Sequence, residues 1–193
     1  MPTRAFSDVD VASRALVMIG TKPITSFGDG TTEATAAATI YEDVVTQVLT
    51  TTRWRFAMAE VELQMLTEVP LVKWKAAYQL PSDTLSISAL RANNTDIPFD
   101  RYQDKIYCDQ INTAPVYLDY VRRVDTADWP PYFTLPVIHL LASELAIAVA
   151  QNEQLSALHA EKYEVFASRG RTTDSQGRTN SVLHLKRYEK ARR

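Results

Sequence analysis

Histidine, cysteine and paired carboxylates are the side chains of this chain that could do chemistry. His139 stands in the most apolar stretch, five residues before Glu144, so the two do not share a helical face and form no metal-binding pair. We expect His139 to be a core histidine with one satisfied hydrogen bond rather than a ligand. His159 is expected to be solvated on an amphipathic helix, and His184 lies in a polar tail. The histidines therefore predict no active site.

The remaining candidates also favour structural roles. Glu60 and Glu62 alternate as exposed positions of a strand do, which is typical of a solvated face rather than of an acid–base pair. Gly28-Asp29-Gly30 lacks the further spacing and the Lys-Ser/Thr of a phosphate-binding loop. Cys108 is the only cysteine, which excludes an internal disulfide, and we expect it to be a small buried residue. The sequence thus predicts no catalytic, cofactor-binding or metal-binding residue.

The distribution of charge is more informative than its total. With 46% hydrophobic and 23% charged residues the composition is that of a globular protein. Between Arg169 and the C-terminus stand eight basic residues and two acidic ones, which gives the last 25 residues a formal charge of +6 and leaves −8 on residues 1–168. A basic tail on an acidic body indicates contact with an acidic surface, either protein or nucleic acid.

Targeting segments are not evident in the sequence. The N-terminus lacks the apolar region of a signal peptide, and the apolar stretch 135–150 contains Pro136, His139 and Glu144 and is too short to span a bilayer. We therefore expect a soluble protein made in the cytoplasm, without a membrane partner.

The C-terminal segment 171–193 is predicted to be a basic arm that orders when it binds. Its apolar residues could anchor it while the flanking basic side chains meet an acidic partner. A solubilising, disordered C-terminus remains the alternative. The expected binding residues are Arg171, Arg178, Val182, Leu183, Leu185, Lys186, Arg187, Lys190, Arg192 and Arg193.

Helical signals dominate the first third of the chain. Ser7 with Asp10 forms a capping box that opens a helix, and Gly20 stands where a glycine ends one. A second helix is expected from Thr31 or Thr32 to about residue 52. Residues 53–56 alternate arginine with an aromatic residue, which predicts a strand or an extended segment.

The middle of the chain changes to strand signals before helix returns. Four or five short strands, among them 74–80, 85–90, 104–108 and 116–124, are separated by turn residues and predict one connected antiparallel sheet. The apolar stretch 135–150 predicts a central buried helix with Pro136 in its first turn. A last helix should run from about Asn152 to Gly170. The predicted fold is α+β, an antiparallel helical bundle (1–68 and 129–170) with an inserted antiparallel β subdomain (69–128) and an extended C-terminal tail (171–193).

The order of these features resembles the head–tail connector (adaptor) family of tailed bacteriophages and gene transfer agents, which includes tail tubular protein A of short-tailed coliphages. Five segments across about 160 residues carry the resemblance. Pro136 departs from the pattern and is expected to shorten the final bundle helix at its start. The segments are the helix ending in Ile19-Gly20 before Lys22-Pro23-Ile24; Val48-Leu49 followed by Trp54-Arg55-Phe56-Ala57; Tyr78-Gln79-Leu80-Pro81-Ser82-Asp83; Val116-Tyr117-Leu118-Asp119-Tyr120 with Asp128-Trp129-Pro130-Pro131-Tyr132-Phe133; and Leu140-Leu141-Ala142-Ser143-Glu144-Leu145-Ala146.

The resemblance implies a structural protein rather than an enzyme, with no cofactor. Members of such a family form a homo-oligomeric ring, expected here to hold twelve copies, beneath the portal protein at the head–tail junction of the virion. The ring continues the channel for packaged DNA and presents a docking surface to the next tail component, a tail tube or nozzle protein. A C-terminal extension that contacts the portal would give the basic arm its role. Assembly would begin in the host cytoplasm.

Two other functions remain open from the sequence. A nucleic-acid-binding module could use the basic arm, and its affinity would then fall steeply with salt. A hydrolase could assemble its site from scattered residues, because a Ser/His/Asp constellation needs only to meet in space. No nucleophile-elbow motif supports the hydrolase.

Overall fold

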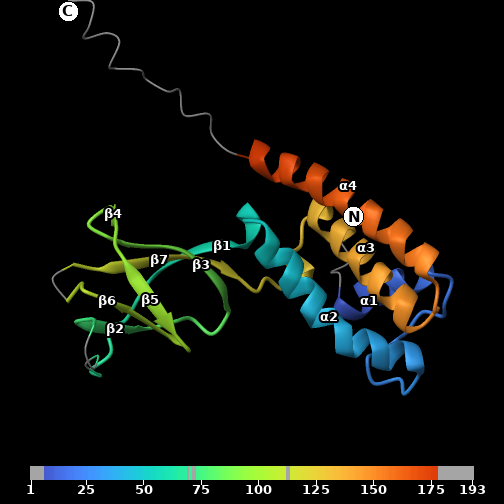
Figure 1. Ribbon diagram of the computed structural model, residues 1–193, viewed down its shortest axis with the longest axis horizontal. Helices are drawn as coiled ribbons and strands as arrows, with labels where there is room; N and C mark the ends of the chain where they lie inside the picture. The colour runs from blue at the N-terminus through green and yellow to red at the C-terminus, as the bar shows by residue number, and fades with distance from the viewer. Residues whose placement is uncertain (1–6, 69, 71–72, 112–113, 178–193) are drawn as a thin grey trace, which may run out of the picture.

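The computed structural model describes residues 7–68, 70, 73–111 and 114–177 and confirms the mixed α+β fold. Its described part holds four α-helices, and two small antiparallel sheets are inserted between the second and the third helix. Figure 1 shows the helices gathered in one part of the molecule and the strands in another, side by side along the longest axis. We call these parts the bundle and the β part.

The first two helices begin and end close to where the sequence predicts. In α1 (Asp8–Met18) the capping box between Ser7 and Asp10 is formed on both sides, and Gly20 follows with a φ of +79°, a conformation that glycine adopts without strain. Helix α2 (Thr32–Thr51) is capped by the Thr31 hydroxyl, which accepts from the N–H of Ala34. The faces that the apolar spacing selects are buried in both helices.

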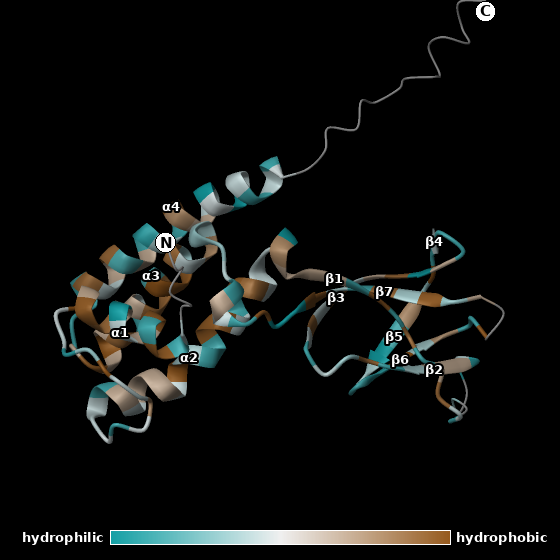
Figure 2. Cartoon of the chain, turned by 180° about the vertical axis from the view of Figure 1, so that it is seen from behind, coloured by the Kyte–Doolittle hydropathy of each residue, from teal (hydrophilic) through white to brown (hydrophobic). Residues whose placement is uncertain are grey.

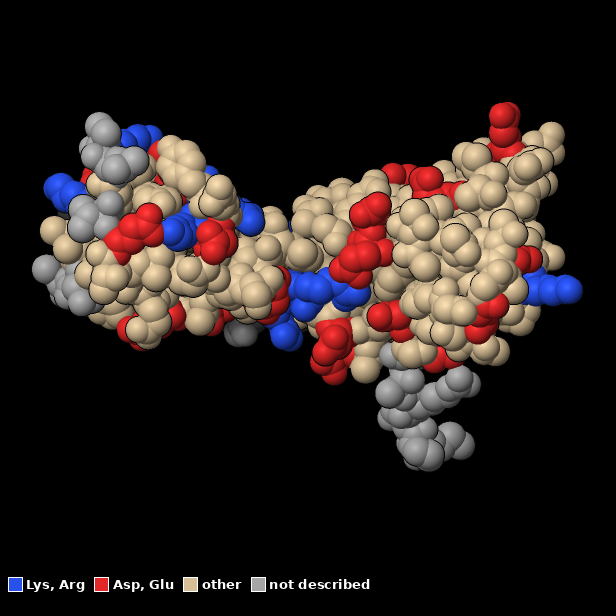
Figure 3. Space-filling view, turned by 90° about the horizontal axis from the view of Figure 1, so that it is seen from below, with Lys and Arg blue, Asp and Glu red and all other residues tan. Residues whose placement is uncertain are grey.

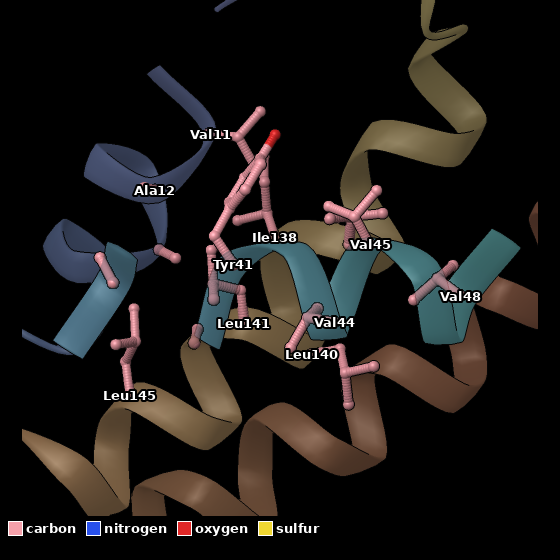
Figure 4. Packing of buried hydrophobic residues seen from close by; sticks show 14 of the residues in the cluster. Val11, Ala12, Tyr41, Val44, Val45, Val48, Ile138, Leu140, Leu141 and Leu145 are labelled. Atoms are coloured by element: carbon pink, nitrogen blue, oxygen red, sulfur yellow. The ribbon is translucent and has the colours of Figure 1, made fainter. Parts of the chain in front are cut away.

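Helix α3 (Pro131–Ala148) is the centre of the bundle and packs against α1, α2 and α4. Figure 4 shows buried side chains of α1, α2 and α3 converging, among them Val11, Tyr41 and Ile138. By length and composition alone α3 could cross a membrane, but 61% of it is buried inside the protein, as in the core helix of a bundle. The hydropathy colouring of Figure 2 marks the same helix as strongly hydrophobic.

Two predictions about helix ends are wrong. Pro136 lies inside α3 rather than in its first turn, because Pro131 occupies the first helical position and starts the helix four residues earlier than expected. Helix α4 (Glu153–Gln176) does not end at Gly170, which is buried within it. Residues 171–176, assigned to the arm, are therefore helical, and Pro136 does not shorten α3 at its start.

The strands form two sheets instead of the single predicted one. The first has the order β1-β7-β3-β4 and the second the order β2-β6-β5, all antiparallel. Strand β1 lies within the segment 1–68 that was assigned to the bundle, so the β part begins earlier than residue 69. The strands are β1 (Met58–Glu62), β2 (Ala76–Gln79), β3 (Thr84–Ala92), β4 (Thr95–Asp96), β5 (Phe99–Tyr102), β6 (Lys105–Cys108) and β7 (Val116–Arg122).

Each part has its own hydrophobic core, and the first sheet joins the two. One core fills the bundle, and the other lies between the two sheets around Ile106 and Leu118. Val121 and Val124, at and after the end of β7, belong to the bundle core, so this strand leads the chain directly from one core into the other. The β part is thereby anchored to the bundle rather than tethered by a free linker.

Candidate functional site

The C-terminal end of α4 is fixed to the bundle by one buried carboxylate. Asp174 accepts a hydrogen bond from the main-chain N–H of Arg55 (2.7 Å) and another from the hydroxyl of Tyr132 (2.8 Å). Arg55 opens a 3-10 helix, η1 (Arg55–Ala57), that leads from α2 into β1. Burial, then the Asp174 carboxylate, raises the pKa of Tyr132 to about 12, so its hydroxyl stays a donor near neutral pH. The root of the C-terminal arm is therefore a defined point of the structure.

An aromatic cluster lies beneath this anchor. Trp54 is fully buried, donates its indole N–H to the carbonyl of Val48 (2.8 Å) and packs on Phe56, Tyr132 and Phe133. The strand or extended segment predicted for residues 53–56 is wrong in its backbone, because residues from Arg55 onward form a 3-10 turn. The alternation itself is found, since Trp54 and Phe56 share the cluster while Arg53 and Arg55 are exposed. These contacts hold the end of α2, the start of α3 and η1 together.

A cavity of about 720 Å³ lies beside the anchor, between the ends of α2 and α4 and the first sheet. Its walls come from both the bundle and the β part, and it is open on one side. Figure 1 shows the ends of α2 and α4 lying near each other next to β1 and β3. The cavity is lined by Thr52, Arg53, Arg55, Met58, Ser88, Ala89, Arg91, Asp119, Arg171, Asp174 and Ser175.

Arginine dominates the chemistry of this cavity. Arg91 pairs with Asp119 at 2.8 Å and with Asp96 at 3.1 Å. Arg53, Arg55 and Arg171 are exposed and form no ion pair within the part of the chain that the structure describes. A concave surface with unpaired guanidinium groups can bind an oxyanion, since each guanidinium offers a planar set of donors.

A second polar link joins the two parts away from the cavity. Arg123, just after β7, forms a two-pronged ion pair with Glu42 of α2 at 2.7 and 3.0 Å. In the view of Figure 3, basic and acidic side chains adjoin at the narrow waist between the two parts of the molecule. We assign this pair a structural role, because both partners are already satisfied by each other.

The predicted core histidine is confirmed, but its partner was not foreseen. The Nδ1 atoms of His139 and His159 lie 3.0 Å apart, and the ring of His139 stacks on Phe166. His159 is buried rather than solvated, because it meets His139 in the seam between α3 and α4. Burial, the neighbouring imidazole and Lys162 lower the pKa of His139, while burial and Lys162 lower that of His159. The pair is a neutral core contact.

The burial predicted for Cys108 and the exposure predicted for Glu60 and Glu62 are confirmed. Cys108 is fully buried, and burial raises the pKa of its thiol, which disfavours the reactive thiolate. Glu60 and Glu62 are exposed on β1. Asp29 accepts the N–H groups of Thr25 and Ser26 and so closes its own loop. Within the described ranges no three His, Cys, Asp or Glu side chains come together in a way that could hold a metal ion.

The predicted arm residues divide between the structure and the undescribed tail. Arg171 lies on α4 and lines the cavity. The other nine, from Arg178 to Arg193, lie outside the described residues. Sequence reasoning missed Arg53, Arg55 and Arg91 as members of one group, although the spacing of Arg53 and Arg55 around Trp54 was visible.

No protein-family model matches the chain, and a search of curated proteins finds no match.

Proposed function

We propose that this protein is a structural head–tail adaptor of a tailed phage or phage-like particle. It forms a ring beneath the portal protein, continues the channel for packaged DNA and offers a docking surface to the next tail component. Twelve copies are expected from the resemblance. Assembly is the mechanism, so the free energy that matters lies in contacts between copies and with the neighbouring rings.

The observation that carries the proposal is that three of the five motifs of the resemblance contact one another in space. The Trp54 indole of the second motif bonds Val48 of the same motif and packs on Tyr132 and Phe133 of the fourth. Asp83, which ends the third motif, accepts a hydrogen bond from the Tyr120 hydroxyl of the fourth at 3.2 Å. The second, third and fourth segments are therefore linked by contacts where the helices and the first sheet join, which is more than three unrelated short matches would provide.

The position of the arm also supports the proposal. The described chain ends at Gly177, one helical turn beyond the Asp174 anchor, so the following segment starts from a fixed place on the bundle. A basic arm held at a fixed root can bind an acidic surface in many copies at once, and such multivalency raises the affinity of a ring far above that of a single arm.

The decisive experiment removes residues 178–193 and leaves α4 intact. We expect the truncated chain to lose binding to the portal in a pull-down and in negative-stain images of the complex, with an unchanged circular dichroism spectrum apart from the missing residues. A matched full-length variant replaces Val182, Leu183 and Leu185 by serine and keeps every charge, so it separates apolar anchoring from electrostatics. Portal binding that survives the truncation would contradict the assignment of the arm.

A nucleic-acid-binding module remains the second candidate, favoured by the charge of the arm alone. It predicts a logarithm of affinity that falls steeply with the logarithm of salt concentration and is lost with residues 178–193. DNA binding of the truncated chain at full strength would exclude the arm as the DNA-binding element. Sequence-independent DNA binding together with portal binding would remain compatible with an adaptor whose channel encloses DNA.

A further inference from the structure

We infer that the cavity between the ends of α2 and α4 and the first sheet binds the carboxylate side chains of an acidic segment from a protein partner. The residues involved lie in the described part of the chain and not in the segment 178–193. The inference therefore adds a second contact surface to the proposed function, and it can fail without affecting portal binding by the arm.

The concentration of cationic groups is the first argument. The described residues hold 14 Lys and Arg against 22 Asp and Glu, a formal charge of −8. Four of those 14 basic residues nevertheless line this one cavity, contributed by the segment after α2, by β3 and by α4. Three of the four, Arg53, Arg55 and Arg171, have no ion-pair partner within these residues. The fold thus collects positive charge where the body is otherwise acidic.

The two acidic residues of the cavity offset only part of its positive charge, since four arginines line it. Asp119 is paired with Arg91, and Asp174 accepts from the N–H of Arg55 and the hydroxyl of Tyr132. Both carboxylates therefore already accept from other donors, whereas Arg53, Arg55 and Arg171 line the cavity and have no ion-pair partner within the described residues. An incoming carboxylate can form two parallel hydrogen bonds with a guanidinium, the strongest form of this pairing.

The chemistry and size of the site favour a protein carboxylate over a nucleic-acid backbone. The Arg91–Asp119 pair shows that the cavity already accommodates an arginine–carboxylate contact. A polynucleotide would extend beyond the cavity, and its regularly spaced phosphates would meet a body of formal charge −8. A volume of about 720 Å³ falls in the range of ~300–1,000 Å³ typical of sites for small ligands, which suits a few side chains of a short segment.

The test is an NMR titration of the isotope-labelled full chain with capped hexaglutamate. We expect chemical-shift changes at the backbone amides of residues 52–55, 88–91 and 171–175. In the double variant Arg55→Gln/Arg171→Gln the affinity measured at these amides should fall about tenfold. The matched control Arg101→Gln/Arg169→Gln removes two exposed arginines that do not line the cavity and should leave the affinity measured there unchanged.

Two results would overturn the inference. One is an equal loss of affinity at the cavity amides in the control and in the Arg55/Arg171 variant, because charge in general would then explain the binding, or no loss in either, because these arginines would then not bind the probe. The other is a larger response of the same amides to an oligothymidylate of similar charge, or to inorganic phosphate, than to hexaglutamate. Binding of either probe to the segment 178–193 appears at other amides and is thereby counted separately.

Discussion

Gly170 of α4 lies directly against the main-chain carbonyl oxygen of Tyr132 on α3. A Cβ atom at position 170 would stand 2.6 Å from that oxygen and 3.2 Å from the Cη2 atom of Trp54. Pro136 removes the usual donor to this carbonyl, since residue 136 would normally give its N–H to the carbonyl four residues earlier and proline has none. Two residues that commonly end helices are thus both used inside helices, where α3 and α4 make their close approach.

Replacing Gly170 by alanine should destabilise the protein. In an exposed helix interior the change stabilises by up to about 1 kcal/mol, but here the new methyl group overlaps a backbone oxygen that cannot move aside. We expect a loss of about 1–3 kcal/mol in the free energy of unfolding, measured by chemical denaturation. Gly177→Ala is the matched control, because its added Cβ would meet its nearest neighbour at an ordinary 3.6 Å. Equal stability of the two variants would contradict the close approach.

The His139–His159 pair should make stability depend on pH. One Nδ1 must donate and the other accept, so the contact cannot survive when both rings carry a second proton. Both pKa values are lowered below 6.5 in the folded protein, so the unfolded chain binds more protons in that range. The stability contributed by the pair is therefore fully present above about pH 6.5 and is lost as the pH falls toward the folded-state pKa values.

The measurement is the free energy of unfolding as a function of pH in the wild type and in two variants. The double variant His139→Gln/His159→Gln should lose the part of the slope that lies below about pH 6.5. Lys162→Gln keeps the pair but removes a nearby positive charge that lowers both pKa values, so it should reduce that slope without abolishing it. The same slope in all three proteins would show that the two histidines bind equally many protons in the folded and the unfolded state, which contradicts the prediction.

Local signals in the sequence were sufficient to predict where α1 and α2 begin and which of their faces are buried. The Ser7–Asp10 capping box and the Thr31 cap act within one turn, so their effect depends on residues that the sequence places side by side. His139 was also predictable, because residues 135–138 before it and 140–142 after it are all apolar. These features need no knowledge of distant contacts.

The features that sequence reasoning missed all depend on partners far along the chain. His159 is buried because His139, twenty residues away, meets it across the α3–α4 seam. Gly170 stands inside a helix because α4 there approaches the carbonyl of Tyr132, which leaves no room for a Cβ atom. The strands separate into two sheets because β7 pairs with β1 and β3, a choice of partners that alternation alone cannot specify. The arginine cavity likewise exists only once α2, α4 and β3 are brought together.

Asp174 and Tyr132 should show a strong energetic coupling that measures how firmly the root of the arm is held. Asp174→Ala leaves the N–H of Arg55 and the half-buried hydroxyl of Tyr132 without this acceptor, at a cost of about 1–3 kcal/mol in the free energy of unfolding. Tyr132→Phe removes only one of the two donors and should cost less. Since both changes break the same 2.8 Å bond, their effects in the double variant should fall short of the sum by about 0.5–3 kcal/mol. Additive effects in this double-mutant cycle would mean that the bond does not form in solution, and α4 would then lack the anchor from which the arm is proposed to reach its partner.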